Sequence, residues 1–396
     1  MELIFLLVIM NSRMCYASGF NLSDKRPTWK RSFIQIPVLS KIQKSKWLPS
    51  PVFAKAPETG LALGLGLFYS PQWNKDTSLR RSGLSWVAAV TQQKQYIFSS
   101  AGNISSLNDQ FMASWNLGAR KYFDRYYGIG NENSVNTYTN FRFNLLSLQA
   151  SGLLRISKSS HFIGPQIRWQ TMNEIKWDIT PNQMPPGGYG YHTAGFGFRW
   201  VLDRRNELIN PTQGSYIEFG YRIHPRFRLV PSKDFLEAVA LNRIPKDTLP
   251  NPSYQQWVFD YRAYIPLFRS VNSPILASRC IVNFSGPGTP FREIPSLGGS
   301  ATMRGLFLGS YRDYMVASLE NEIRYPINSF IGINLYTGLG HTGFQNPRPF
   351  QKAPLFSSGF GLRLTPNPRN RTLLRLDWAY ASDGQKGFYI ELNENF

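Results

Sequence analysis

The sequence predicts an all-β chain that forms a closed antiparallel transmembrane β-barrel of about 16 strands. Apolar and polar residues alternate with a period of two along most of the chain, and no apolar run is long enough to cross a bilayer as a helix. Aromatic residues make up 15% of the 396 residues, whereas hydrophobic residues reach only 42%. Barrel strands alternate lipid-facing apolar residues with polar or small lumen-facing residues, so a mean hydropathy of −0.29 is compatible with a membrane wall.

The N-terminal region contains the longest uninterrupted apolar run, residues 3–10. This run is far shorter than the roughly 20 residues that a transmembrane helix needs. Cys15 and Ala17 flank Tyr16 in a pattern typical of a signal-peptide cleavage site. The sequence therefore predicts a signal peptide over residues 1–17. An N-terminal periplasmic or linker segment is expected over 18–50, and an outer-membrane barrel over 51–396.

The alternation assigns each predicted strand two unlike faces. Ile217 and Phe219 point one way, for example, while Glu218 and Arg222 point the other. A soluble β-sandwich also alternates within single strands, but here charges oppose large aromatic residues in strand after strand, which favours the barrel. The pattern predicts strands near residues 60–71, 83–93, 94–106, 110–122, 139–155, 160–172, 192–204, 214–226, 254–267, 273–285, 313–326, 331–343, 356–366, 372–383 and 387–396, with a short one between 33 and 56.

Connections between the predicted strands alternate between short and long. This is expected when one rim carries tight periplasmic turns and the other carries external loops. The long connections include residues 227–253 and 286–312, which the alternation assigns to the same external rim.

The formal charge of +20 comes from 44 Lys and Arg residues against 24 Asp and Glu residues. These basic residues are scattered along the chain, and many occupy inward positions of strands. No compact basic helix or arm is present, so we expect no nucleic-acid partner. Glu320 and Glu322 fall on the same inward face as Arg324, which predicts a charge-balanced lumen rather than acid–base catalysis.

The motifs of enzymes and metal sites are missing from the sequence. The four histidines are isolated, without metal-ligand spacing. There is neither a phosphate-cradling Gly-Lys-Ser/Thr loop nor a Gly-x-Ser-x-Gly elbow. We therefore expect no enzymatic activity, no metal site and no cofactor.

Several motifs in order resemble the bacterial surface-antigen family, the outer-membrane barrel superfamily that includes BamA, TamA and the two-partner secretion transporters. The most specific stretch runs from residue 297 to 327. The resemblance implies that residues 286–312 form the family's sixth external loop, whose Arg-Gly tip folds back into the lumen. The loop and lumen residues singled out by this resemblance are Gly298, Gly299, Arg304, Gly305, Asp313, Glu322 and Arg324.

A second motif resembles the family's turn between two strands. It begins with Asp203 and Arg205 and returns through Pro211 and Gly214. We expect these four residues to shape the connection between the strands on either side.

Two departures from the family pattern modify these expectations. Gly338 stands where family members carry a carboxylate that partners the loop arginine. We therefore predict that Arg304 instead reaches Glu322, while Gly298, Gly299 and Gly305 let the backbone fold inward. The periplasmic POTRA domains that precede most family barrels are also expected to be missing.

The chain end supplies a further expectation. Phe396 follows Phe388, Ile390 and Leu392 on the predicted outward face. It resembles the terminal aromatic residue that barrel-assembly machinery reads, so we predict that Phe396 is a C-terminal insertion signal.

The resemblance implies a barrel of the membrane-protein assembly or translocation kind in the bacterial outer membrane. Its expected partners are outer-membrane lipid, the barrel-assembly machinery during biogenesis and a periplasmic partner protein. Two alternatives remain open: a passive outer-membrane pore, and a surface-antigen barrel without an assembly role.

Overall fold

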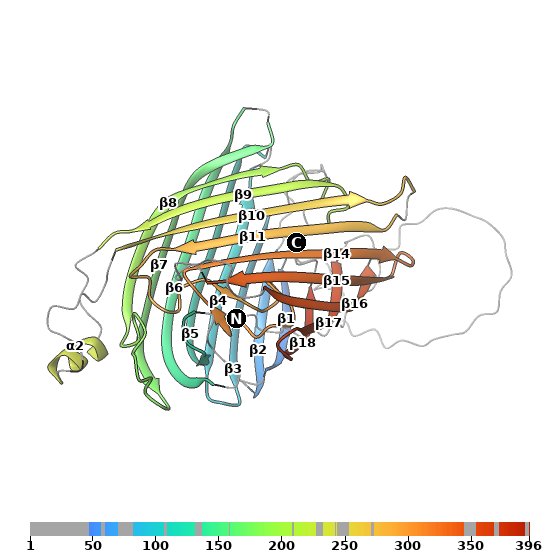
Figure 1. The fold of residues 1–396 in the computed structure, drawn as a ribbon. Coiled ribbons are helices and arrows are strands. Elements are labelled where there is room, and N and C mark those ends of the chain that lie inside the picture. Colours follow the sequence, from blue (N-terminus) through green and yellow to red (C-terminus); the bar gives the residue numbers. More distant parts are fainter. Residues whose placement is uncertain are drawn as a thin grey trace.

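The computed structural model describes residues 47–56, 60–69, 82–106, 109–130, 137–157, 159–207, 210–226, 233–241, 243, 253–270, 273–343, 354–367, 372–392 and 396. The predicted signal peptide and most of the predicted N-terminal segment lie outside this part of the chain. Figure 1 shows long strands that tilt across one another and curve around an interior, which we call the lumen.

A 16-stranded antiparallel sheet contains nearly all the regular structure, which confirms the all-β prediction. The strands in the order of the sheet are β1 (Trp47–Ala56), β2 (Gly60–Tyr69), β3 (Gly83–Thr91), β4 (Tyr96–Ser105), β5 (Phe111–Tyr126), β6 (Thr139–Arg155), β7 (His161–Trp177), β8 (Tyr191–Asp203), β9 (Gly214–His224), β10 (Tyr254–Pro266), β11 (Ile275–Ser285), β14 (Met315–Pro326), β15 (Ile331–Thr342), β16 (Leu355–Asn367), β17 (Thr372–Ala381) and β18 (Lys386–Leu392). Among the described residues, β1 pairs with β2 and β18 pairs with β17, and no pairing joins β1 to β18. Closure of the sheet between β1 and β18 therefore stays a prediction.

The two faces of the sheet differ as the alternation predicted. Leu65 and Leu335 on the outer face are 73% and 64% exposed. On the inner face Arg375 and Asp377 are fully buried. Such exposure of large apolar side chains would be costly in water, and the pattern is the inverse of a soluble sandwich.

Three boundaries differ from the sequence-based expectation. β1 begins at Trp47, so residues 47–50 belong to the sheet rather than to a linker. β5 and β7 continue to Tyr126 and Trp177, several residues past their predicted ends. Both extensions pair with the start of β6, where Phe141 lies opposite Asp124 on one side and Trp177 on the other.

The long connection between β9 and β10 contains a short helix, α2 (Lys233–Ala240), which the sequence pattern did not predict. Its buried residues Phe235 and Ala238 pack against Tyr189, in the connection between β7 and β8. Among the described residues, no helix has the length and apolarity needed to cross a membrane.

Candidate functional site: the lumen loop

Residues 286–314, which connect β11 to β14, form a segment that we call the lumen loop. Within it β12 (Ser296–Leu297) pairs with β13 (Tyr311–Arg312) as a two-stranded ribbon. Leu297, Met303 and Leu306 are buried and form a hydrophobic cluster with Tyr311. A loop in open solvent would not bury these side chains, so this segment packs as part of the folded interior.

Phe291 attaches the first part of the lumen loop to the wall of the sheet. Its ring packs among Tyr126, Phe141 and Trp177, with ring centroids 5.3–5.7 Å apart. The backbone N–H of Phe291 donates to the Pro186 carbonyl at 2.7 Å. Aromatic packing thus holds this part of the loop against β5, β6 and β7.

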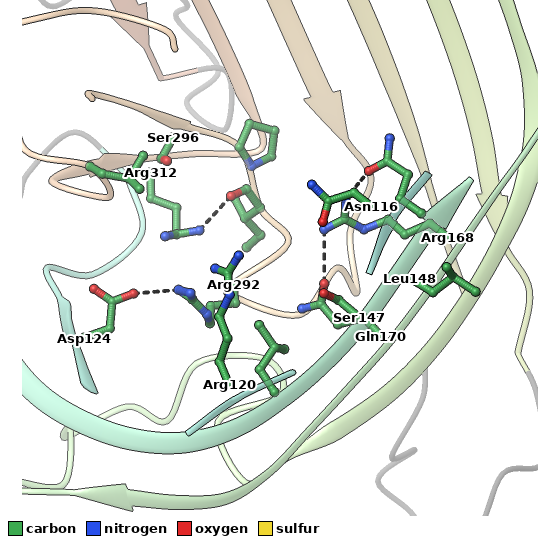
Figure 2. A pocket seen from close by; sticks show the side chains of 15 residues that line it. Asn116, Arg120, Asp124, Ser147, Leu148, Arg168, Gln170, Arg292, Ser296 and Arg312 are labelled. Atoms are coloured by element: carbon green, nitrogen blue, oxygen red, sulfur yellow. Dashed lines mark hydrogen bonds and ion pairs between the residues drawn. The ribbon is translucent and has the colours of Figure 1, made fainter. Parts of the chain in front are cut away.

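Arg292 and Glu293 add polar contacts to this attachment. Arg292 Nη1 lies 2.6 Å from Asp124 Oδ2 of β5 (Figure 2). The buried Glu293 carboxylate lies 3.0 Å from Arg168 Nε of β7, and it accepts a hydrogen bond from Thr193 of β8 at 2.9 Å. Burial raises the pKa of Glu293, but Arg168 and other nearby positive charges outweigh it and hold that pKa below its usual value. Sequence analysis missed Glu293, because nothing in the local pattern indicates a partner so far away in the chain.

The tip of the lumen loop turns sharply at glycines. Gly305 adopts a φ of +102°, which L-residues with a side chain rarely adopt, and it passes close to the backbone of Tyr380 in β17. Gly298 has a φ of +110°, and a Cβ there would lie 2.3 Å from the Phe307 carbonyl oxygen. The backbone at these two positions of the loop therefore requires glycine.

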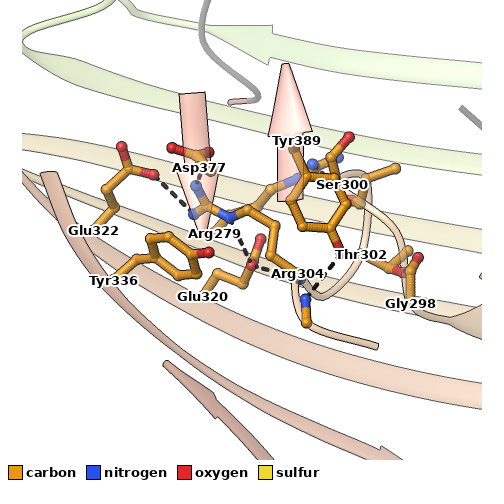
Figure 3. Close-up of polar contacts among 12 residues, drawn as sticks. Arg279, Gly298, Ser300, Thr302, Arg304, Glu320, Glu322, Tyr336, Asp377 and Tyr389 are labelled. Atoms are coloured by element: carbon orange, nitrogen blue, oxygen red, sulfur yellow. Dashed lines mark hydrogen bonds and ion pairs between the residues drawn. The ribbon is translucent and has the colours of Figure 1, made fainter. Parts of the chain in front are cut away.

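Arg304 is fully buried and is surrounded by three carboxylates (Figure 3). Its Nη2 lies 2.8 Å from Glu322 Oε2, its Nη1 lies 2.9 Å from Asp377 Oδ2, and its Nε lies 3.3 Å from Glu320 Oε1. The guanidinium also stacks over the Tyr336 ring, 3.6 Å from the centroid. Burial lowers the pKa of Arg304, but the three carboxylates outweigh this effect and raise the pKa well above its usual value.

Further arginines of the wall share the same carboxylates. Arg363 bridges Glu322 at 2.7 Å and Asp377 at 2.5 Å. Arg324 reaches Glu322 at 3.3 Å, and Arg375 pairs with Asp377 and Glu391. Buried charges tolerate desolvation best when each lies beside a counter-charge, and in this network every one of these arginines lies within ion-pair distance of at least one carboxylate.

Backbone contacts hold the loop tip from the other side. The N–H of Gly305 donates to the Tyr389 hydroxyl at 3.0 Å, and the N–H of Phe307 donates to Gln385 Oε1 at 2.6 Å. Ser300 donates to Glu391 at 2.5 Å. The tip is therefore fixed to β14, β17 and β18 together with the turn that precedes β18.

The sequence matches the Omp85 superfamily domain over residues 58–396. The chain belongs to the Omp85 superfamily. Among solved structures, it is similar to BamA from Haemophilus ducreyi lacking POTRA domains 1–3, with 12% identity, a TM-score of 0.53 and coverage of 88% of this chain and 69% of that one. It is also similar to CdiB from Escherichia coli (10% identity, TM-score 0.56, coverage 88% and 62%) and CdiB from Acinetobacter baumannii (14%, 0.53, 88% and 59%).

These identities show a shared fold and no more. The chain spans 59–69% of the length of these three structures. No curated protein matches the sequence.

In this Omp85 chain, Gly338 of β15 offers no carboxylate to Arg304, and a carboxylate from another strand pairs with the arginine. A Cβ at Gly338 would lie 2.6 Å from Ser357 Oγ and within 3.6 Å of Met303 and Glu320 side-chain atoms, so the site has no room for a larger residue without rearrangement. Asp377 of β17 approaches Arg304 instead. The alternation indicated that Asp377 faces inward, but it gave no sign that the loop tip would reach it.

Asp313 lies where the lumen loop returns to β14, apart from the Arg304 cluster. Its N–H donates to the Pro295 carbonyl at 3.1 Å, and its Oδ1 accepts from the N–H of Tyr314 at 2.7 Å. Burial raises the pKa of Asp313. Asp313 thus fixes the backbone of the loop rather than Arg304.

The turn motif between β8 and β9 closes a hairpin on the rim. Asp203 forms an ion pair with Arg205 at 2.8 Å, and the Arg205 guanidinium lies over the Tyr216 ring. Pro211 is buried in this turn. Gly214 has a φ of +105°, and a Cβ there would lie 2.1 Å from the Arg204 carbonyl oxygen.

Phe396 lies on the inner side, which differs from the outward position expected. Its ring is 3% exposed and packs with Tyr264 and Ala277, which belong to the inner face. Arg324 Nη2 donates to the Phe396 carbonyl at 2.9 Å. β18 ends at Leu392, so counting alternate positions beyond that residue does not predict where Phe396 points.

Proposed function

We propose that this chain is an outer-membrane β-barrel of the assembly or translocation kind, closed in lipid and carrying the lumen loop as a plug. Membership of the Omp85 superfamily supports this class. The apolar outer face supports a lipid environment, since Leu65 and Leu335 are largely exposed.

The observation that carries the proposal is the burial of Arg304 among Glu320, Glu322 and Asp377. A barrel that served only as an open pore would gain nothing from filling its interior with a loop held by desolvated ion pairs, which are costly unless fully compensated. A barrel whose interior must be sealed at rest, and opened for a client chain, benefits from such a plug.

The proposed location is the bacterial outer membrane. There the barrel-assembly machinery would insert the chain, and outer-membrane lipid would cover its outer face. A periplasmic protein is the proposed partner for client delivery. No catalytic step, cofactor or metal enters this function.

Depletion of the protein in its native host tests the proposal. The abundance of other outer-membrane proteins should fall, or one secreted protein should stay in the periplasm. Complementation with the wild-type chain should restore the profile, and Arg304→Ala should restore it poorly. Arg269→Ala, a change at an exposed residue on the turn after β10, serves as the matched control.

Planar bilayer recordings separate the alternatives. Steady conductance by the purified wild-type barrel, together with an unchanged protein profile after depletion, would favour a passive pore. An unchanged profile without conductance would favour a surface antigen with no transport role.

A further inference from the structure

A polar cavity of about 380 Å³ lies between the lumen loop and the inner faces of β5, β6 and β7 (Figure 2). It is separate from the Arg304 cluster, because its lining comes from the first part of the loop and from its return strand. Neutral hydrogen-bonding side chains contribute to its wall. They are Asn116, Ser147, Gln149, Gln170 and Ser296.

Positive charge is in excess around this cavity. Arg120, Arg168, Arg292 and Arg312 line it, against the single carboxylate of Asp124. Asp124 pairs with Arg292, and Arg168 pairs with Glu293. After these two pairings, Arg120 and Arg312 have no carboxylate in ion-pair contact among the described residues.

Arg120 is the clearest sign of a missing counter-charge. Its Nε is shielded from solvent and makes no hydrogen bond to the described residues. Arg120 as a whole is half-buried, but an N–H that is shielded from water and lacks an acceptor is costly, because its lost hydration is not replaced. The side chain extends from β5 toward the loop and the cavity, as Figure 2 shows.

Arg312 is also undercompensated. It is 9% exposed, and its Nη1 donates to the carbonyls of Phe291 and Ile294, which supply partial charges only. Burial and the nearby Arg292 lower the pKa of Arg312 to about 10. The fold of the loop brings Arg292 and Arg312 close to Arg120, although the positive charges of these arginines repel one another.

We propose that this cavity binds an oxyanion of phosphate chemistry, held by Arg120, Arg292 and Arg312. Guanidinium groups bind phosphate oxygens through paired, charge-assisted hydrogen bonds, and the neutral amides and hydroxyls of the wall suit the remaining oxygens. The ligand is either a soluble phosphate compound or a phospholipid headgroup, since the same groups recognise both. Its binding strengthens the contact of the lumen loop with β5.

Purified full-length protein in detergent micelles tests this site with pyrophosphate as the probe. Pyrophosphate should bind in calorimetry and raise the thermal unfolding midpoint more than sodium chloride of equal ionic strength. Arg120→Gln should weaken binding by about tenfold or more, because a charge-assisted contact is lost. Without pyrophosphate, Arg120→Gln should be no less stable than wild type, because it removes an uncompensated charge.

Two further variants keep the test decisive. Arg269→Gln changes an exposed arginine outside the cavity and should leave binding unchanged. Asn116→Asp introduces a carboxylate into the cavity wall and should abolish binding even if Arg120→Gln fails to fold. Equal binding by wild type, Arg120→Gln and Asn116→Asp, or no binding by wild type, would overturn the proposal.

The source of the phosphate is resolved by extracting the purified protein and analysing the extract by mass spectrometry. A phospholipid that copurifies with wild type but not with Asn116→Asp indicates a headgroup. A soluble phosphate compound with the same dependence indicates a small-molecule ligand. Both results support the site, whereas identical extracts from the two proteins, in the absence of pyrophosphate binding, contradict it.

Discussion

Arg304 Nη1 lies 2.9 Å from Asp377 Oδ2, although 73 residues separate the two in the sequence. The pair joins the tip of the lumen loop to β17, with neither side chain exposed to solvent. Asp377 also accepts from Arg363. One carboxylate therefore holds together the loop tip and two strands of the wall.

Asp377→Asn should destabilise the barrel and loosen the loop. The change leaves Arg304 and Arg363 with less negative charge in a desolvated site, where breaking a buried pair typically costs about 3–5 kcal/mol. Chemical unfolding in lipid or detergent measures the stability, and limited proteolysis between residues 298 and 309 measures the loop. Asp178→Asn, at an exposed position, is the control. Unchanged stability and protease resistance would show that the contact contributes little.

The attachment at Glu293 should depend on pH. Its pKa is lowered in the folded protein from the ordinary 4.5, so its contribution to stability is fully present above about pH 4.5 and is lost as the pH falls through the folded-state value. Glu293→Gln should therefore lower the unfolding midpoint most at neutral pH, because the variant leaves Arg168 unpaired. The difference from wild type should shrink below pH 4.5. A constant difference across that range would contradict this account.

Leu362→Arg should destabilise the barrel in lipid by about 2–4 kcal/mol if the residue lies near the bilayer midplane. Leu362 lies directly opposite Leu376 on the outer face, so two apolar side chains meet there. Arginine at Ile331, at the start of β15 near the rim, should cost less. Equilibrium unfolding in vesicles measures both variants, and equal, negligible effects would mean that the assigned outer face does not meet lipid.

Phe396→Ala should lower the stability of the folded barrel by about 3–5 kcal/mol, because it leaves a cavity beside Tyr264 and Ala277. Its predicted role as an insertion signal is a separate matter. Refolding of the purified variant reports on stability, while the amount of heat-modifiable barrel in cells reports on insertion. Normal refolding with poor insertion would favour the signal, and normal behaviour in both assays would refute both roles.

The strand pattern was predictable because it depends on local order. Alternation over ten or so residues fixes which side chains share a face, and β9 places Glu218 and Arg222 inward as expected. The contact of Arg304 with Glu322 was predicted from the inward position of Glu322 together with the family resemblance, which implied that the loop arginine enters the lumen. The boundaries of β5 and β7 were less predictable, because they depend on partners in β6.

The remaining site residues could not be predicted from local pattern. Glu293 and Asp377 acquire their partners only when the lumen loop folds against strands that are distant in sequence. Phe396 was placed on the wrong face because the alternation was extended past the end of β18. A period of two holds only while the backbone stays extended in the sheet.

The lumen loop is fastened at two separated groups of strands. Glu293 contacts β7 and β8, whereas Arg304 contacts β14 and β17. The segment between Glu293 and Arg304 links these two groups of strands. The groups therefore cannot move apart without breaking the buried ion pairs of either Glu293 or Arg304. Widening of the interior is thereby coupled to release of the loop, and both anchors must hold for the loop to resist it.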